Sequence, residues 1–378
     1  MLKYLKQGIL TLLFFIGGTK MAGKHGKNSR RNDNDRRTKK KKKGLKIFGI
    51  ILLVIILIIL GVVAGGYWYV TDKLGKMQQI NISEEDLNIN SEVDEYLSEY
   101  RNIAIFAVDS RDSDLGKGNR SDGVIIASIN NNTKEVKLLS VYRDTYLQIE
   151  GHGLDKITHA YSYGEAPLAI NTLNTNLDLN IKEFVTVNFD SVAEAVNALG
   201  GVDIEITNEE LKYINEYIDH TSETTGITSK NLTKAGKQKL DGVQAVAYSR
   251  IRYTAGGDYK RSERMRTVIM AMVDKLKTKS IGEINNLLDT ILPKVYTNIS
   301  ANSIIAMVPD ALNYKITESI GWPYDTKGIT LNSWYGVPVT LESNVKQLHL
   351  ELFGEEDYEP TETVKNISSK IINKTGYR

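Results

Sequence analysis

The 378-residue sequence contains no cysteine, and this absence excludes whole classes of site. Without thiols there is no disulfide framework, no thiolate zinc site, no iron–sulfur cluster and no cysteine nucleophile. The sequence also lacks the phosphate-binding G-x-x-x-x-G-K-[ST] loop, the G-x-S-x-G nucleophile motif and the H-E-x-x-H zinc motif. Its five histidines are scattered, so a histidine metal site is not expected. None of these common motifs can therefore indicate the function.

The chain also has little net charge, +2, but this value averages two unlike parts. Residues 20–46 hold thirteen Lys and Arg against two Asp, and Lys3 and Lys6 bring the first 46 residues to +13. The residues from 47 to 378 must therefore carry a net charge of −11. A short basic segment precedes a long acidic chain that has room for two domains.

Twenty-four residues without a charge, Ile47 to Val70, separate the two parts. A helix of this length spans about 36 Å, enough to cross a hydrocarbon core of about 30 Å. Lysines precede the stretch, and Tyr67, Trp68 and Tyr69 stand at its far end, as interfacial aromatic residues do. The pattern predicts one transmembrane helix over 47–70. A cleaved signal peptide is less favoured, because the apolar stretch is long and no clear A-x-A site follows.

The charge asymmetry predicts the orientation of this helix. By the positive-inside rule, segment 1–46 stays in the cytoplasm and the acidic part lies outside the cell. Segment 1–46 is interpreted as disordered and in contact with anionic lipid, rather than as a nucleic-acid patch, because its basic part has no aromatic residue and no motif. We also expect translation to start at Met21. The prediction is a single-pass protein of the cell membrane with no nucleic-acid partner.

The acidic part divides into three regions by composition. Residues 71–100 are polar and acidic, which predicts an extracellular stalk or accessory segment with a short helix near 92–100. Residues 101–354 alternate strand and helix patterns and are expected to form one catalytic domain. Residues 355–378 turn polar and are expected to form a flexible tail.

Strand and helix patterns in the middle region predict its fold class. Short β-branched or aromatic runs predict strands at 102–108, 123–129, 136–141, 183–189 and 202–206. Helical periodicity and capping signals predict helices at 166–177, 190–200, 233–248 and 258–279, with further helices near 281–292, 300–312 and 343–353. Two more strand-like segments lie near 328–332 and 337–341. The result is an α/β domain, a mixed central sheet with helices on both faces, preceded by one transmembrane helix.

Charged residues stand where the predicted strands end. Asp109 follows the strand 102–108, and Arg120 and Asp122 precede the strand 123–129. Two carboxylates at the same edge of a sheet would suit a hard divalent cation such as Mg²⁺, which prefers oxygen ligands. The alternative is that both aspartates only cap turns.

Arginine, rather than lysine, recurs at the ends of other elements. A cation in the first turn of a helix opposes the helix dipole, which a phosphate bound at that terminus would explain. The planar guanidinium also suits two-pronged phosphate contacts. The alternative is pairing with nearby acids. The arginines concerned are Arg143 after a strand, Arg250 and Arg252 two residues apart, and Arg261 and Arg264 in the first turn of the long helix.

Arginines and a carboxylate-bound metal around phosphate indicate phosphoryl transfer or pyrophosphate cleavage. Because ATP is scarce outside the membrane, a phosphorylated lipid carrier is a better expected substrate than a nucleotide. Apolar elements, including the long helix and 166–177, are candidates to line a groove for an isoprenoid tail. The alternative, packing in the ordinary core, is favoured for any single residue.

The same stretches resemble the LytR-CpsA-Psr family of Gram-positive cell-wall enzymes. The resemblance covers about 100–275 in the family's order, and the predicted topology is also similar. The matching sequences are AVDSRDSD…NRSDGVIIASI, SVYRDTYLQI, KITHAYSYGEAPLAINTL, VNFDSVAEAVNALGGVDIEI and LDGVQAVAYSRIRYTAGGDYKRSERMRTVI.

The resemblance implies an α/β/α catalytic domain of this family and a phosphotransferase activity. A glycopolymer, such as wall teichoic acid or a capsular polysaccharide, would pass from undecaprenyl pyrophosphate to the C6 hydroxyl of N-acetylmuramic acid in peptidoglycan, assisted by Mg²⁺. It implies that Asp109 and Asp122 bind the metal, and that either takes the proton of the hydroxyl. It implies catalytic roles for Asp109, Asp122, Arg120 and Arg143, and substrate binding by Arg143, Arg250, Arg252, Arg261, Arg264 and Lys156.

Three departures from the family pattern fall inside these motifs. The family usually has glycine before the first aspartate region, proline before the Arg-Asp pair and glutamine after the second arginine of the long helix. Here these positions hold Ala107 or Val108, Tyr142 and Met265. A polar contact to the substrate would be lost at Met265, and Arg266 is the expected substitute.

Three alternatives stay open at this point. A hydrolase of the same lipid-linked pyrophosphates would use water in place of the muramyl hydroxyl. A membrane-bound transcriptional regulator would bind promoter DNA through residues 20–46. A non-catalytic lipid-binding scaffold would tolerate the loss of Asp122 and Arg143.

Overall fold

The computed structural model describes residues 65–110, 115–116 and 118–378. The predicted basic segment 1–46 and most of the predicted membrane span 47–70 lie outside these residues. Within them, no helix has the length and apolar character needed to cross a membrane. The chain falls into two units, Met1–Asp72 and Lys73–Arg378, and the description below concerns the second.

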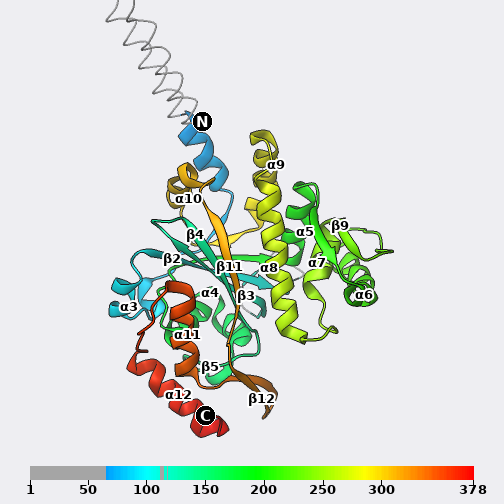
Figure 1. The fold of residues 1–378 in the computed structure, drawn as a ribbon. Coiled ribbons are helices and arrows are strands. Elements are labelled where there is room, and N and C mark those ends of the chain that lie inside the picture. Colours follow the sequence, from blue (N-terminus) through cyan, green and yellow to red (C-terminus); the bar gives the residue numbers. More distant parts are fainter. Residues whose placement is uncertain (1–64, 111–114, 117) are drawn as a thin grey trace, which may run out of the picture. The chain divides into compact units, whose positions relative to one another are not determined.

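A mixed sheet of seven strands forms the centre of this unit (Figure 1). Strands β2, β3 and β4 are antiparallel neighbours, whereas β7 runs parallel to β2 and β11 runs parallel to β4. The prediction of a central mixed sheet is confirmed. The strand order is β1 (Gln78–Gln79), β10 (Tyr296–Thr297), β7 (Glu183–Asn188), β2 (Tyr100–Val108), β3 (Ser121–Asn130), β4 (Glu135–Val141) and β11 (Lys315–Trp322).

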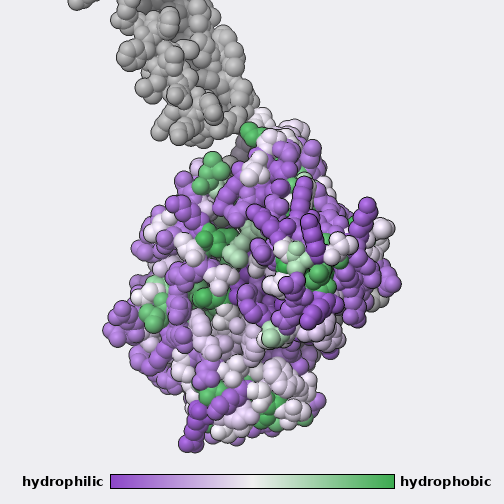
Figure 2. All heavy atoms as spheres, turned by 45° about the vertical axis from the view of Figure 1, so that its right-hand side comes forward, coloured by the Kyte–Doolittle hydropathy of each residue, from purple (hydrophilic) through white to green (hydrophobic). Residues whose placement is uncertain are grey.

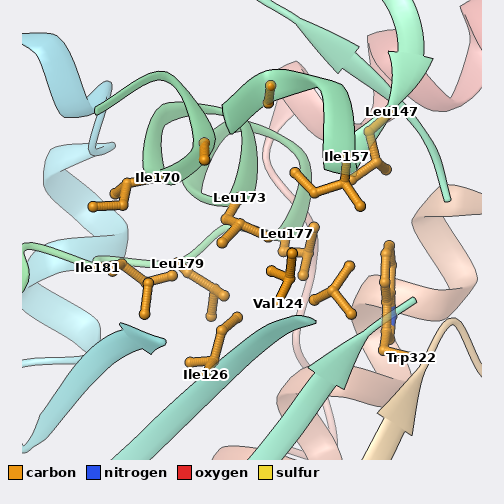
Figure 3. Close-up of a cluster of buried hydrophobic side chains, with 14 of the residues drawn as sticks. Val124, Ile126, Leu147, Ile157, Ile170, Leu173, Leu177, Leu179, Ile181 and Trp322 are labelled. Carbon is orange, nitrogen blue, oxygen red and sulfur yellow. The ribbon is translucent and has the colours of Figure 1, made fainter. Parts of the chain in front are cut away.

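Helices cover both faces of the sheet, as the alternation of patterns predicts. One face packs against α4 (Ile157–Leu177), α11 (Leu341–Phe353) and α12 (Glu362–Thr375) in the main core. Figure 3 shows Val124 of β3 close to Leu177 of α4, within the same buried cluster. The other face packs against α8 (Gly257–Leu276), with α5 (Phe189–Ala198), α7 (Gly242–Arg250) and α9 (Ile281–Ile291) beside it. The face turned forward in Figure 2 is mostly hydrophilic, with small scattered hydrophobic areas.

Short elements complete the unit. They are η1 (Glu84–Leu87), α3 (Ser91–Tyr96), β5 (Tyr146–Ile149), β6 (Gly153–Lys156), β8 (Val202–Ile206), α6 (Asn208–Thr225), β9 (Gly236–Leu240), η2 (Leu292–Lys294), α10 (Ala301–Met307), η3 (Val308–Asp310), β12 (Thr326–Thr330) and β13 (Trp334–Pro338). The sequence analysis did not predict α6 or β11. Part of the predicted helix 233–248 is instead strand β9. Its residues alternate in burial along the chain, as residues of a strand do, and they pair with the residues of β8.

Two regions expected to lie outside the domain contribute to its core. Residues 71–100 supply β1 to the sheet and bury Leu87, Val93 and Leu97 in the main cluster. Residues 355–378, expected to be a flexible tail, contain α12, whose buried face includes Val364 and Ile371. Residues 355–378 are polar overall, but their apolar residues lie on one face of α12. One apolar face is sufficient to dock a helix against a core.

A buried histidine in α11 makes the stability of this core depend on pH. His349 is completely buried, its Nε2 lies 3.1 Å from the carbonyl oxygen of Leu177, and its ring stacks on Tyr358 at 3.6 Å. Burial lowers the pKa of His349 from 6.5 to about 4. As the pH falls, the unfolded state therefore binds this proton before the folded state does.

We expect the free energy of unfolding to be unaffected by His349 above pH 6.5 and to lose about 3 kcal/mol through this group between pH 6.5 and 4. Urea denaturation of wild type and His349→Gln at pH 7 and pH 4.5 measures this loss, and the variant should show a smaller pH dependence. His152→Gln, at an exposed histidine, is the control and should follow the wild type. Equal pH dependence in His349→Gln and wild type would contradict the prediction.

Candidate active site

The charged residues at the strand ends meet at one edge of the sheet. Strand β2 ends at Val108 beside Ser121 at the start of β3, so Asp109, directly after β2, and Asp122, the second residue of β3, lie at the same edge of the sheet. Strand β4 is antiparallel to β3 and ends at the same edge, one residue before Tyr142 and two before Arg143. The Nη1 of Arg143 lies 2.5 Å from Oδ1 of Asp122, and both side chains are only 14% exposed. Strand pairing alone brings these two residues together.

Two further arginines reach the same carboxylate from the helical side. The Nη2 of Arg252 lies 3.4 Å and the Nη1 of Arg261 lies 3.5 Å from Oδ2 of Asp122. Arg261 also pairs with Asp258 at 3.0 Å, and Arg252 lies 3.6 Å from the same oxygen of Asp258. Three guanidiniums thus face two carboxylates, which leaves positive charge at this edge of an otherwise acidic domain.

The turn between α7 and α8 positions these arginines. Helix α7 begins at a capping box of Asp241 and Gln244 and ends at Arg250, after which Ile251 is extended. Gly256 directly precedes helix α8, and its φ of +90° favours glycine. The turn lies between Arg252 and Arg261, and the two side chains converge on Asp122.

Two buried guanidinium groups have donors without an acceptor. The Nε atoms of Arg143 and Arg261 are buried and have no hydrogen-bond partner within the described residues. A buried donor left unpaired costs about 1–3 kcal/mol, so a ligand that supplies acceptors would be stabilised here. Burial lowers the pKa of Arg261 to about 10, even though Asp258 and Asp122 raise it, so this side chain is still charged at neutral pH. The arrangement is that of a site for an anion rich in oxygen atoms.

The other predicted residues surround this centre. Arg250 donates to Thr221 Oγ1 at 3.0 Å and lies over the ring of Phe189, and its pKa is lowered by burial and raised by Asp109 and Asp122. Asp109 and Arg120 are exposed and joined through their backbones, the amide of Asp109 donating to the carbonyl of Arg120.

Lys156, the one lysine among the predicted residues, contacts a carboxylate beside the site. Lys156 contacts Asp144 at 2.8 Å, and Asp144 directly follows Arg143 in the chain. The sequence analysis did not assign a role to Asp144 or to Asp258. The sequence contained enough information to pair Asp258 with Arg261, because residues three apart lie on the same face of a helix.

Arg264, predicted to bind substrate, lies elsewhere. It is buried and its donors are engaged by Glu210 Oε1 at 2.7 Å, the carbonyl of Ile251 at 3.0 Å and Thr254 Oγ1 at 2.6 Å. These bonds connect α8 to α6 and to the turn before α8. Arg264 therefore holds the turn that carries Arg252, and its guanidinium does not join the cluster around Asp122.

Arg266, the expected substitute for the glutamine, contacts strand β11. Its Nε donates to Ser319 Oγ of β11 at 2.7 Å. Met265 instead packs over Gly123, where an added Cβ would lie 3.0 Å from its sulfur. Met265 thus replaces the polar residue of the family pattern and lines an apolar pocket.

This apolar pocket, about 200 Å³, lies between the sheet and the helices α5, α8 and α9. Ala107 and Phe189 link its lining to the charged edge, since Ala107 lies two residues before Asp109 and the Phe189 ring lies beneath Arg250. Of the two elements named as candidates for a lipid groove, helix α8 lines this pocket, whereas 166–177 packs in the main core on the opposite face of the sheet. The lining consists of Ile105, Ala107, Ile125, Val187, Phe189, Ser191, Val192, Ala195, Ser249, Met265, Val268, Ile269, Met272 and Ile291.

A larger hollow, about 880 Å³, lies at the opposite edge of the sheet. Its cations Arg101 and Lys182 are already paired with Glu183 and Asp94, so it offers no free positive charge to an anion. In the described part of the chain, no group of three or more His, Asp or Glu residues is placed to hold a metal ion.

Comparison with known proteins places these observations in a family. The model of the LytR_cpsA_psr family matches residues 66–347. A polyisoprenyl-teichoic acid–peptidoglycan teichoic acid transferase TagU from Enterococcus faecalis is 33% identical over 68% of this chain and 78% of that relative. A transferase of the same name from Bacillus cereus is 30% identical over 77% of this chain and 94% of that relative.

Solved structures show the same fold. The crystal structure of TagT from B. subtilis has a TM-score of 0.51 and 25% identity, and the match covers 67% of this chain and 91% of that chain. The protein gbs0355 from Streptococcus agalactiae has a TM-score of 0.56 and 23% identity, with 72% of this chain and 92% of that chain covered.

Proposed function

The chain belongs to the LytR_cpsA_psr family, and we propose that it transfers a glycopolymer from a polyprenyl pyrophosphate carrier to peptidoglycan. Its curated relatives are teichoic acid transferases, so the chain is an enzyme of the same class. In the proposed reaction the carrier is undecaprenyl pyrophosphate, the polymer is a wall teichoic acid or another wall polysaccharide, and the acceptor is the C6 hydroxyl of N-acetylmuramic acid.

One observation carries the proposal: the arginine cluster around Asp122 lies beside the apolar pocket under α8. A polyprenyl pyrophosphate has two charged phosphates joined to an apolar chain. Arg143, Arg252 and Arg261 offer guanidinium donors to the phosphates, two of which are unpaired Nε atoms. The pocket offers an apolar surface to the first part of the chain. The two halves of the substrate therefore match two adjacent parts of the protein.

The proposed step joins an acceptor oxygen to phosphorus. The oxygen of the hydroxyl attacks the phosphorus that bears the glycopolymer, and the bond from this phosphorus to the bridging oxygen breaks. The carrier leaves as its monophosphate, and the proton of the hydroxyl passes to Asp109 or Asp122. Arg143 and Arg261 stabilise the negative charge that develops on the leaving phosphate.

Mg²⁺ belongs to this proposal, and the residues present are suited to it. This ion is commonly held by one or two carboxylates together with substrate phosphates, and Asp109 and Asp122 supply two carboxylates at one edge. Bound there, the ion would neutralise charge on the pyrophosphate.

The proposed topology follows from the charge pattern. We propose that residues 47–70 anchor the chain in the cell membrane, with segment 1–46 in the cytoplasm and the catalytic unit outside. The active site would then lie in the compartment that contains peptidoglycan.

A transfer assay tests the function against its nearest alternative. The full chain in detergent is incubated with a polyprenyl pyrophosphate-linked saccharide and Mg²⁺, with and without a peptidoglycan glycan. Transfer predicts saccharide joined to the glycan and release of polyprenyl phosphate that depends on the glycan. Release of polyprenyl phosphate with no saccharide on the glycan would show a hydrolase instead.

The apolar pocket gives a second prediction. Ala195 of α5 lines the pocket, and tryptophan in its place would fill much of its volume. We expect Ala195→Trp to weaken binding of a lipid-linked substrate at least tenfold, because each buried CH₂ contributes about 0.8 kcal/mol. Binding of a water-soluble pyrophosphate analogue should stay unchanged. Ala198→Trp, on the exposed side of the same helix, is the control. Equal loss for both ligands would point to distortion of the site.

A further inference from the structure

Another pocket, about 320 Å³, adjoins the arginine cluster, because Asp258 lines it and its lining residues Tyr142 and Asp144 flank Arg143 in the chain. It lies between the turn that starts α8, the end of β4 and the β12–β13 hairpin. Its volume is within the range of small-molecule sites, about 300–1,000 Å³. None of the residues that line it belongs to the proposed lipid-binding pocket.

Three aromatic side chains from separate segments form its walls. Tyr142 follows β4, Tyr259 is in the first turn of α8, and Trp334 begins β13. Tyr142 and Tyr259 meet edge to face with their ring centres 4.4 Å apart. Tyr259 and Trp334 are 40% and 46% exposed, so their ring surfaces are accessible. Flat apolar rings with polar groups nearby suit a ligand that has both an apolar face and hydroxyl groups.

Two carboxylates in the same pocket are held in place by cations. Asp144 contacts Lys156 at 2.8 Å, and Asp258 contacts Arg261 at 3.0 Å. Ionised carboxylates only accept hydrogen bonds, so they favour hydroxyl and amide donors and repel phosphate. The phosphates would therefore stay on the arginines, and a neutral ring would enter the aromatic pocket.

The same two carboxylates connect this pocket to the reacting centre. Asp144 follows Arg143 directly, and Asp258 shares Arg252 and Arg261 with Asp122. A ligand in the pocket is thus next to the group that would hold the phosphate. The glycines at 256 and 257, which also line the pocket, leave room for it because they carry no side chain.

We propose that the pocket formed by Tyr142, Tyr259 and Trp334 binds a sugar ring attached, or about to be attached, to the transferred phosphate. This rests on the proposed function, which supplies the reason for a phosphate beside it. A pyranose has a face of C–H groups to pack on the rings and hydroxyls to donate to Asp144 and Asp258. The ring comes either from the lipid-linked donor or from the glycan acceptor.

Substitutions on two independent walls test the proposal in the full chain. We expect Trp334→Ala and Tyr259→Ala each to weaken sugar binding about tenfold, whereas Trp334→Phe stays within about threefold of wild type, since it keeps an aromatic ring. Leu331→Ala, an exposed change in the same hairpin outside the pocket, is the matched control. Calorimetric titration compares polyprenyl pyrophosphate with and without an attached saccharide, and the transfer assay gives a KM for donor and for acceptor.

The two ligands separate the possible results. If the sugar is the donor's, the alanine variants weaken binding of the saccharide-bearing lipid and raise its KM, while bare polyprenyl pyrophosphate binds as before. If it is the acceptor's, only the KM for the glycan rises. Unchanged values for both substrates in both alanine variants would overturn the proposal. Failure of wild type to bind bare polyprenyl pyrophosphate would instead refute the proposed function.

Discussion

Alanine in place of Arg143 is expected to lower kcat for transfer about 100- to 1,000-fold, the usual effect of removing one donor aimed at a developing charge. Arg143 is the residue in closest contact with Asp122, and its unpaired Nε provides a donor for phosphate. The remaining contacts of Arg252 and Arg261 should still hold Asp122, so the fold should persist. Turnover of a lipid-linked saccharide, with circular dichroism to check folding, measures the effect.

Two further variants make this result specific. Arg143→Lys should fall between wild type and alanine, because lysine keeps the charge but not the planar pair of donors. Lys260→Ala removes an exposed cation of α8 that pairs with Glu263 and should leave kcat unchanged. A folded Arg143→Ala protein that still anchors wall polymer at the normal rate would favour the scaffold alternative.

Alanine in place of Glu210 is expected to lower the free energy of unfolding by about 3–5 kcal/mol, the usual cost of leaving a buried charge unpaired. Glu210 and Arg264 form an ion pair at 2.7 Å with side chains 9% and 5% exposed. The bond to Arg264 and the backbone amide of Thr207 help to lower the pKa of Glu210 against the effect of burial, so it is charged at neutral pH. Urea denaturation measures the loss.

The double variant Glu210→Leu/Arg264→Met distinguishes a structural pair from a substrate-binding arginine. It should recover most of the lost stability, because two apolar side chains replace two buried charges. Glu263→Ala, which breaks an exposed pair on the same helix, should cost no more than about 1 kcal/mol. A stable Arg264 variant with a raised KM for the lipid-linked substrate would instead restore the role that the sequence predicted for Arg264.

The strand-end residues show how far the sequence could predict the site. Asp122 and Arg143 stand next to apolar runs that read as neighbouring strands, and strands that pair bring their ends together. The sequence therefore sufficed to predict that these residues gather at one edge. It also predicted that the arginines after α7 and in the first turn of α8 belong with them.

The sequence could not separate Arg261 from Arg264. Both lie in the first two turns of α8, three residues apart, and a pattern of residue types treats them alike. Their roles diverge because α6, which the sequence analysis did not predict, places Glu210 beside Arg264. The aromatic pocket was hidden for the same reason, since Tyr142, Tyr259 and Trp334 are far apart in the chain.

The sequence by itself determined the charge asymmetry, the central strands and the residue types of the proposed phosphate site, because these depend on local composition and on periodicity. Only the tertiary structure decided which arginines face Asp122, which one is held by Glu210, and that residues 71–100 and α12 belong to the core. The physical reason is that side-chain partners are chosen by packing between distant segments. One turn of a helix more or less moves a guanidinium from an anion site into a buried ion pair.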